Sequence, residues 1–135
     1  MDRVFLDSNV LFSAAWGDGG RTRRLWDLAA VQLVTSEYAV EDVRRNLRDP
    51  AALHSLDTLL RGARVEDPPD GLVQLPAAAG TLPDDDRPIL EAAIAVRATH
   101  LLTGNVRDFR SLLGRRIGGV LALRPSTYLN LVRGR

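Results

Sequence analysis

The chain has 135 residues, of which 45% are hydrophobic and 26% charged, a size and composition typical of one soluble globular domain covering residues 1–135. It contains no cysteine, which excludes disulfides and thiolate sites and disfavours zinc, because His54 and His100 would be the only imidazole ligands. The net charge of +1 excludes the strongly basic class of protein that coats nucleic acid.

The first half of the chain alternates short apolar runs with helical patterns. In chain order we predict a strand at 4–6, capping residues at 7–9 before a helical turn, a glycine break at 17–20, a helix over about 21–30, a strand at 32–35, a helix capped by residue 36, and a helix from 50 to about 60. The last two helices are expected to turn leucine, valine and alanine side chains inward.

The second half continues the alternation after a proline-rich stretch. We predict a loop over 66–83 with a short strand at 72–75, a helix after 84–86, a strand at 99–103, a short helix at 108–113, a strand at 119–123 and a helix from 125. Strands that are apolar on both faces and separated by helices indicate a parallel sheet covered on both sides. No apolar run approaches the ~20 residues of a membrane helix and no signal peptide precedes the first strand, so we expect a cytoplasmic protein without membrane contact.

Four acidic residues are predicted at one edge of this sheet. Asp7 directly follows the first strand, and Asp108 follows the strand at 99–103. Glu41 falls on the second turn of the helix after the second strand, and Asp86 opens the helix that leads into 99–103. Because ligands of an open parallel sheet bind beyond the carboxyl ends of its strands, we expect the four carboxylates to meet there.

Clustered carboxylates need a cation or protons between them. Two carboxylates ~4 Å apart repel by about 4 kcal/mol at an effective dielectric constant of 20, whereas a domain has only ~5–15 kcal/mol of net stability. Ligand sets made only of oxygen favour Mg²⁺ or Mn²⁺. All 18 basic residues are arginine, whose planar fork suits phosphate oxygens. The combination predicts metal-dependent hydrolysis of a phosphodiester.

Each acid also has a structural interpretation when it is taken alone. Asp7, Asp86 and Asp108 stand at or near predicted helix starts, where a carboxylate caps the helix or favours its dipole. Glu41 alone is typical of a solvated helix residue. The functional interpretation therefore depends on the joint pattern.

Four segments carry these acids in a fixed order: VFLDSNVL at 4–11, LVTS at 33–36 followed by Glu41, Asp86 with apolar residues after it, and LLTGNVRDF at 101–109. Their order and approximate spacing, over about residues 4–123, resemble the PIN-domain family, which includes the VapC-type toxins of bacterial toxin–antitoxin pairs. The Thr-Gly-Asn form of the last segment is similar to that of free-standing bacterial members.

The resemblance implies a three-layer α/β/α sandwich with a central parallel sheet, and cleavage of single-stranded RNA that depends on Mg²⁺ or Mn²⁺. It also implies frequent homodimers and, for the toxin members, a cognate antitoxin. In such a site Asp7, Glu41 and Asp86 hold the principal metal directly or through water, and Asp108 completes the cluster or orients the attacking water. Hydrogen bonds that fix these carboxylates are expected from Asn9, Thr103 and Asn105. The arginines expected to contact RNA phosphates are Arg21, Arg23, Arg24, Arg44 and Arg107.

Two features depart from the family pattern. Many relatives carry an acid where this chain has Asn105, which leaves open whether one or two metals bind. The run Asp84-Asp85-Asp86 leaves the third acid ambiguous, and we choose Asp86 because Ile89 follows it at the spacing of the family pattern.

Three other classes of function share some of these features. A haloacid-dehalogenase-like phosphatase needs an acid two residues after the first aspartate, where Asn9 stands, and a receiver domain needs a lysine that the chain lacks. A PIN-like module that binds RNA or protein without cutting stays the alternative, because Asn105 is compatible with a weakened site. The RNA target, and the choice between a toxin and a housekeeping nuclease, stay open.

Overall fold

The computed structural model describes residues 1–68 and 73–133. Its described strands are β1 (Asp2–Leu6), β2 (Val31–Ser36), β3 (Arg64–Glu66), β4 (His100–Leu102), β5 (Arg116–Ile117) and β6 (Val120–Leu123). They form one sheet in the order β3-β2-β1-β4-β6-β5, in which β5 runs antiparallel to β6 and the other neighbours pair in parallel. The predicted parallel sheet is confirmed, with one antiparallel strand added at its edge.

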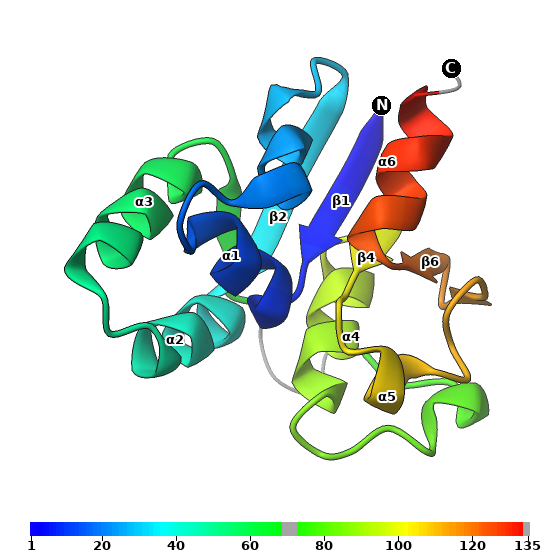
Figure 1. Cartoon of the computed structure of the whole chain (residues 1–135). Helices are drawn as coiled ribbons and strands as arrows, with labels where there is room; N and C mark the ends of the chain where they lie inside the picture. The colour runs from blue at the N-terminus through cyan, green and yellow to red at the C-terminus, as the bar shows by residue number, and fades with distance from the viewer. Residues whose placement is uncertain (69–72, 134–135) are drawn as a thin grey trace.

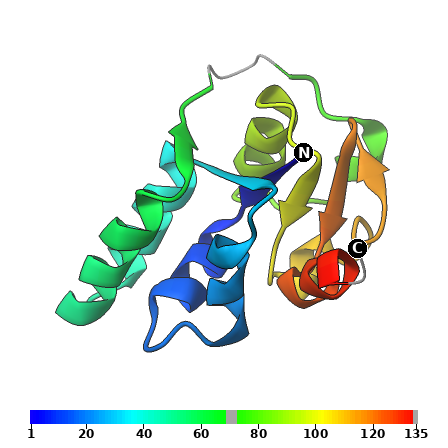
Figure 2. The same cartoon turned by 90° about the horizontal axis from the view of Figure 1, so that it is seen from above.

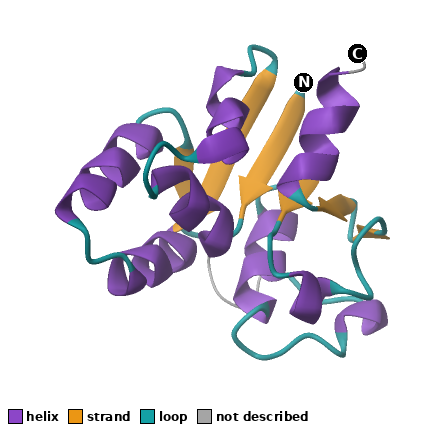
Figure 3. Ribbon diagram, viewed as in Figure 1, coloured by secondary structure: helices purple, strands orange, loops and turns teal. Residues whose placement is uncertain are grey.

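Helices cover both faces of this sheet (Figures 1, 2 and 3). The described helices are α1 (Ser8–Ala15), α2 (Glu37–Asn46), α3 (Pro50–Leu60), α4 (Arg87–Ala95), α5 (Val106–Phe109) and α6 (Pro125–Arg133), with 3₁₀ turns η1 (Gly20–Asp27) and η2 (Ala77–Ala79). Figures 1 and 2 show α1, η1 and α6 on one face and α4 on the other, with α2 and α3 packed against α1. The architecture is the expected three-layer α/β/α sandwich.

β1 is the central strand of the sheet, and its burial fixes the position of the residue that follows it. Val4, Phe5 and Leu6 are completely buried, as expected for a parallel strand packed on both faces. Val4 lies opposite Leu33 of β2 and His100 of β4. The carboxyl ends of β1, β2 and β4 therefore reach the same edge of the sheet, at the lower edge in Figure 1.

Capping side chains fix where the helices after these strands begin. Ser36 ends β2, and its Oγ accepts a hydrogen bond from the backbone N–H of Ala39 at 3.2 Å, so that α2 begins where the sequence predicts. The stripe of Ala39, Val40 and Val43 is buried against the core. This burial leaves the intervening positions of α2 to face solvent or the sheet edge.

Several predicted elements differ from the structure. The helix predicted over 21–30 is the shorter 3₁₀ segment η1, and the short helix predicted at 108–113 begins earlier, at Val106. Residues 73–75 form no strand, and residue 72 of that prediction lies outside the described residues. The sequence pattern missed β3 and β5, because strands of three and two residues are too short to show an alternation. In the described parts of the chain, each helix is too short or too polar to cross a membrane.

Candidate active site

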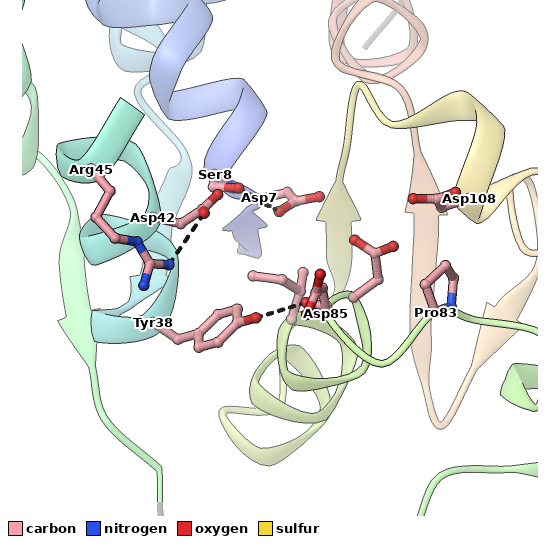
Figure 4. A pocket seen from close by; sticks show the side chains of 10 residues that line it. Asp7, Ser8, Tyr38, Asp42, Arg45, Pro83, Asp85 and Asp108 are labelled. Carbon is pink, nitrogen blue, oxygen red and sulfur yellow. Dashed lines mark hydrogen bonds and ion pairs between the residues drawn. The ribbon is translucent and has the colours of Figure 1, made fainter. Parts of the chain in front are cut away.

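A pocket of about 350 Å³ opens at the carboxyl ends of β1 and β4 (Figure 4). It is lined by Asp7, Ser8, Tyr38, Asp42, Arg45, Pro83, Asp85, Asp86, Ile89 and Asp108. In Figure 4, Asp42 and Arg45 stand on one wall and Asp108 on the other, with Asp7 between them. Five carboxyl groups thus face one guanidinium among the lining residues, so the pocket is strongly acidic.

Asp7 combines the structural and the functional interpretation of its position. It is the N-cap of α1, and its Oδ1 accepts a hydrogen bond of 2.7 Å from the backbone N–H of Ser8. Its side chain is almost fully buried, with 2% exposed. Burial raises the pKa of this carboxyl, and the hydrogen bond from Thr103 opposes that shift.

Hydrogen bonds between the ends of β1 and β4 hold Asp7 in place. Its Oδ2 accepts from the Thr103 hydroxyl at 2.8 Å and from the Asn9 side-chain amide at 3.1 Å. The carbonyl oxygen of that same Asn9 side chain accepts from the backbone N–H of Gly104 at 2.6 Å. A Cβ on Gly104 would lie 3.1 Å from this oxygen, so the tight contact favours glycine there. Asn9 and Thr103 therefore lie where the sequence analysis expected residues that orient a carboxylate.

Asp86 and Asp108 form a second, coupled group of acids. The Asn105 side-chain amide donates to Asp108 Oδ2 at 2.9 Å and to Asp86 Oδ1 at 3.4 Å. Burial, a hydrogen bond with Asp108 and the negative charges of Asp108 and Asp7 together raise the pKa of Asp86 to about 7. The hydrogen bond from Asn105, followed by that from Asp86, lowers the pKa of Asp108. A proton held by Asp86 near neutral pH thus relieves the repulsion between the two groups.

Helix α2 supplies the opposite wall of the pocket. Arg45 pairs with Asp42 at 3.3 Å, one turn apart on the helix. The Tyr38 hydroxyl donates to the backbone carbonyl of Asp85 at 2.9 Å, which joins α2 to the segment before α4. Burial, followed by the charge of Asp85, raises the pKa of Tyr38. The neutral Tyr38 side chain therefore links α2 to the segment before α4 on the other side of the pocket.

The structure does not bring Glu41 to the pocket. Glu41 is exposed on α2, and the next residue, Asp42, lines the pocket in its place. Adjacent residues of a helix point about 100° apart, so a shift of one position moves a carboxylate off the site. The spacing of Tyr38, Asp42 and Arg45, at i, i+4 and i+7, was the available signal, because it puts these side chains on one face.

The three consecutive acids separate in the folded chain. Asp84 is fully exposed and pairs with Arg87 at 3.7 Å, whereas Asp85 and Asp86 both line the pocket. Asp86 occupies the N-cap position of α4, yet its side chain makes no capping hydrogen bond. Its carboxyl group is turned to the other acids instead of to its own helix.

Of the five arginines predicted to contact phosphate, the structure brings Arg107 to the acids. Its Nε lies 3.7 Å from Asp108, and its side chain is 95% exposed. Arg23 donates to the carbonyl of Ala14, and Arg44 pairs with Asp57 at 2.8 Å. Arg21 and Arg24 line a separate groove between η1 and α6. The sequence analysis missed Arg45 inside the pocket and Arg110, which lines with Arg107 an adjoining hollow of about 340 Å³.

The pocket offers the kind of ligand that a hard divalent cation prefers, but its carboxyl groups are spaced more widely than a bound ion requires. Within residues 1–68 and 73–133, no group of three histidine, cysteine or acidic side chains is close enough to hold an ion as it stands. The donors are nevertheless all oxygen, and burial, followed by the neighbouring carboxylates, raises the pKa of Asp86 to about 7. Asp7, Asp86 and Asp108 would hold a divalent cation, whose charge would offset the repulsion among these carboxylates.

Comparison with known proteins agrees with this geometry. A family model described as a PIN domain matches residues 3–107, which include Asp7, Asp42 and Asp86. The chain belongs to the PIN-domain family. PIN domains are in general nucleases, and they usually use divalent metal ions.

A solved structure supports the fold assignment. A chain from the crystal structure of VapBC2 from Rickettsia felis, bound to a DNA fragment from their promoter, superposes on this PIN domain with a TM-score of 0.65. The match covers 90% of this chain and 98% of that chain, at 15% sequence identity. No curated protein sequence matches the chain.

Proposed function

We propose that this PIN domain is an endoribonuclease that cleaves single-stranded RNA with Mg²⁺ or Mn²⁺. The observation that carries the proposal is the coupled acid pair at the strand ends, in which Asp86 has a pKa of about 7 beside Asp108 and the buried Asp7. Perturbed acids of this kind concentrate at functional sites. A purely structural cluster of acids would gain nothing from their mutual repulsion.

Each residue has a defined task in the proposed reaction. Asp7, Asp86 and Asp108 would hold the cation, with Asp42 on the α2 wall where the sequence analysis expected Glu41. When bound, the ion lowers the pKa of a water molecule and offsets charge on the reacting phosphate. Asn9 and Thr103 orient the Asp7 carboxylate by hydrogen bonds. The Asn105 amide orients Asp86 and Asp108 in the same way.

In this proposal, arginine side chains on both sides of the acids would contact the RNA backbone. Arg45 lines the pocket itself, and Arg107 and Arg110 line the adjoining hollow, which shares Pro83 and Asp108 with it. Because Asp7 is recessed, a flexible single strand reaches it by bending, whereas the stiff backbone of a duplex does not. Because the net charge of the chain is only +1, we expect few arginine–phosphate contacts. The logarithm of the RNA-binding constant should fall with the logarithm of the salt concentration, with a slope of ~−0.7 per contact.

We also propose that the chain acts as the toxin of a toxin–antitoxin pair, with a cognate antitoxin and a homodimeric state. The support is the similarity of fold to a chain of VapBC2. Arg21 and Arg24 line the groove between η1 and α6, and their contact with RNA phosphates stays a prediction.

The proposal is tested by cleavage of 5′-labelled RNA with and without Mn²⁺. The substrates are a single-stranded RNA, the same sequence as a duplex, and single-stranded DNA. We expect cleavage of the single-stranded RNA only, loss of that cleavage in Asp86→Asn, and retained cleavage in Asp84→Asn, the matched control outside the pocket. Equal cutting of the duplex would refute the argument from the recessed site.

A PIN-like module that binds RNA or protein without cutting it is the second candidate. The observation that favours it is that no three acids of the described chain are already close enough to share an ion. Binding of the labelled RNA without cleavage of any substrate at high protein concentration, with Mn²⁺ present, would establish this second function in place of the first.

A further inference from the structure

A second hollow of about 180 Å³ adjoins the acidic pocket, between α1 and α2. It is lined by Ser8, Asn9, Phe12, Asp42, Val43 and Asn46. Ser8 and Asp42 line both this hollow and the acidic pocket, so the two lie side by side. A strand whose phosphate lies against the acids therefore has a neighbouring cavity within reach.

Aromatic rings extend from this hollow along α1. Ser8, Phe12 and Trp16 are spaced by four residues and so lie on one face of the helix. The rings of Phe12 and Trp16 are stacked, with centroids 6.0 Å apart and planes within 8° of parallel. Trp16 is 55% exposed. The second tryptophan differs, because Trp26 packs against the core and its indole N–H donates to the Leu59 carbonyl at 2.9 Å.

The chemistry of this surface suits a base better than a phosphate. Its lining carries an aromatic ring, two carboxamides and the acidic Asp42, and no basic side chain. Asp42 repels a phosphate, whereas a nucleobase presents a flat face for stacking and an edge for the Asn46 carboxamide, since the Asn9 carboxamide already bonds Asp7 and Gly104. Exposed aromatic rings beside a backbone-binding groove are the usual platform for unpaired bases.

We propose that the hollow and the Phe12–Trp16 pair bind an unpaired base of the RNA, adjacent to the nucleotide whose phosphate reaches the acids. The inference rests on the proposed function and adds a base-binding subsite to it. The phosphates on the other side of the cleavage point then lie toward Arg107 and Arg110. One strand would thus cross the molecule with bases held at α1 and backbone held at α5.

The test measures binding of a labelled single-stranded RNA by fluorescence anisotropy in EDTA, so that no cleavage is required. We compare the wild type with Trp16→Ala, Trp16→Phe and Leu131→Ala, which removes an exposed apolar side chain on α6. We expect Trp16→Ala to weaken binding about 5-fold or more, and Trp16→Phe and Leu131→Ala to bind as the wild type does. Moving an abasic nucleotide along the RNA should find one position that weakens wild-type binding and leaves Trp16→Ala binding unchanged.

The outcomes separate this subsite from the proposed catalysis. Wild-type binding that depends on Trp16 without any RNA cleavage would leave the subsite standing and overturn the nuclease. Cleavage by the wild type with no effect of Trp16→Ala or of an abasic nucleotide would overturn the subsite alone. A wild-type dimer that Trp16→Ala converts to monomers in sedimentation would also overturn it, because a second copy of the chain would then cover the ring.

Discussion

The side chain of Asp7 shows how one residue serves both the fold and the site. It caps α1 through Oδ1 and accepts from Thr103 and Asn9 through Oδ2. These hydrogen bonds stabilise the charged form, which burial disfavours. The sequence allowed either a cap or a catalytic acid at this position, and the structure shows that the capping contact leaves Oδ2 oriented toward the β4 end.

The coupled acids give the metal-free protein a defined pH dependence. Asp86 titrates near its ordinary pKa of 3.8 in the unfolded chain and at about 7 in the folded one. Between these values the folded state binds more protons, so the free energy of unfolding falls as the pH rises. Asp108 has the opposite shift, but its stabilisation is lost only below its ordinary pKa of 3.8. We expect a higher melting temperature near pH 5 than near pH 8 in EDTA.

Two asparagine variants check this assignment by thermal unfolding in EDTA. Asp86→Asn should reduce the dependence between about pH 5 and pH 8, because one of the two acids whose pKa burial raises is gone and Asp7 remains. Asp84→Asn should keep the wild-type slope, since Asp84 is fully exposed. A slope in Asp86→Asn as steep as that of the wild type would assign the effect to another group.

The choice between Glu41 and Asp42 is a direct test of register on α2. Asp42 lines the pocket and Glu41 faces solvent, so we expect Asp42→Asn to reduce RNA cleavage by 10-fold or more, in the range of a residue that supports metal ligands. Glu41→Gln is the matched control and should cleave at close to the wild-type rate. The reverse result would return the role to the residue that the sequence resemblance indicated.

At the scale of elements, the sequence predicts best those strands and helices whose own apolar or capping pattern agrees with their place in the folded sheet. The apolar runs of β1, β2 and β4 and the capping residue Ser36 specify elements that the structure confirms. β3 and β5 depend on pairing with β2 and β6, and their few residues carry no periodicity of their own. The same holds for the site. The positions of Asp7, Asp86 and Asp108 could be predicted because they adjoin the ends of predicted elements, whereas that of Asp42 depends on how α2 is rotated about its axis.

The start of α2 is expected to control the position of the wall that carries Asp42 and Arg45. Replacing Ser36 by alanine removes the side-chain oxygen that accepts from Ala39, and should lower the free energy of unfolding by about 1 kcal/mol. Denaturant unfolding measures this change. Ser13→Ala, at an exposed position of α1, is the control and should leave stability within about 0.5 kcal/mol of the wild type. Equal effects of both variants would show that the cap contributes nothing.

At the scale of the whole molecule, the acids lie between two surfaces of different chemistry. Arg107 and Arg110 flank them at α5, and Phe12 and Trp16 flank them at α1. Although the net charge of the chain is close to zero, basic, acidic and aromatic side chains are grouped separately near one edge of the sheet. Composition alone did not show this order, because residues more than ninety positions apart in sequence meet there, as in the hydrogen bond between Thr103 and Asp7.

Thermal unfolding of the wild type and Asp7→Asn, in EDTA and in Mn²⁺, tests the claim of a metal site most directly. Manganese at ~100 times its dissociation constant should stabilise the wild type by about 2.7 kcal/mol, with Mg²⁺ effective and Ca²⁺ weaker. Asp7→Asn should fold and be at least as stable as the wild type in EDTA, because asparagine replaces a buried carboxyl group by a neutral side chain. The variant should gain little stability from manganese. No shift in the wild type, or an equal shift in both proteins, would contradict the account.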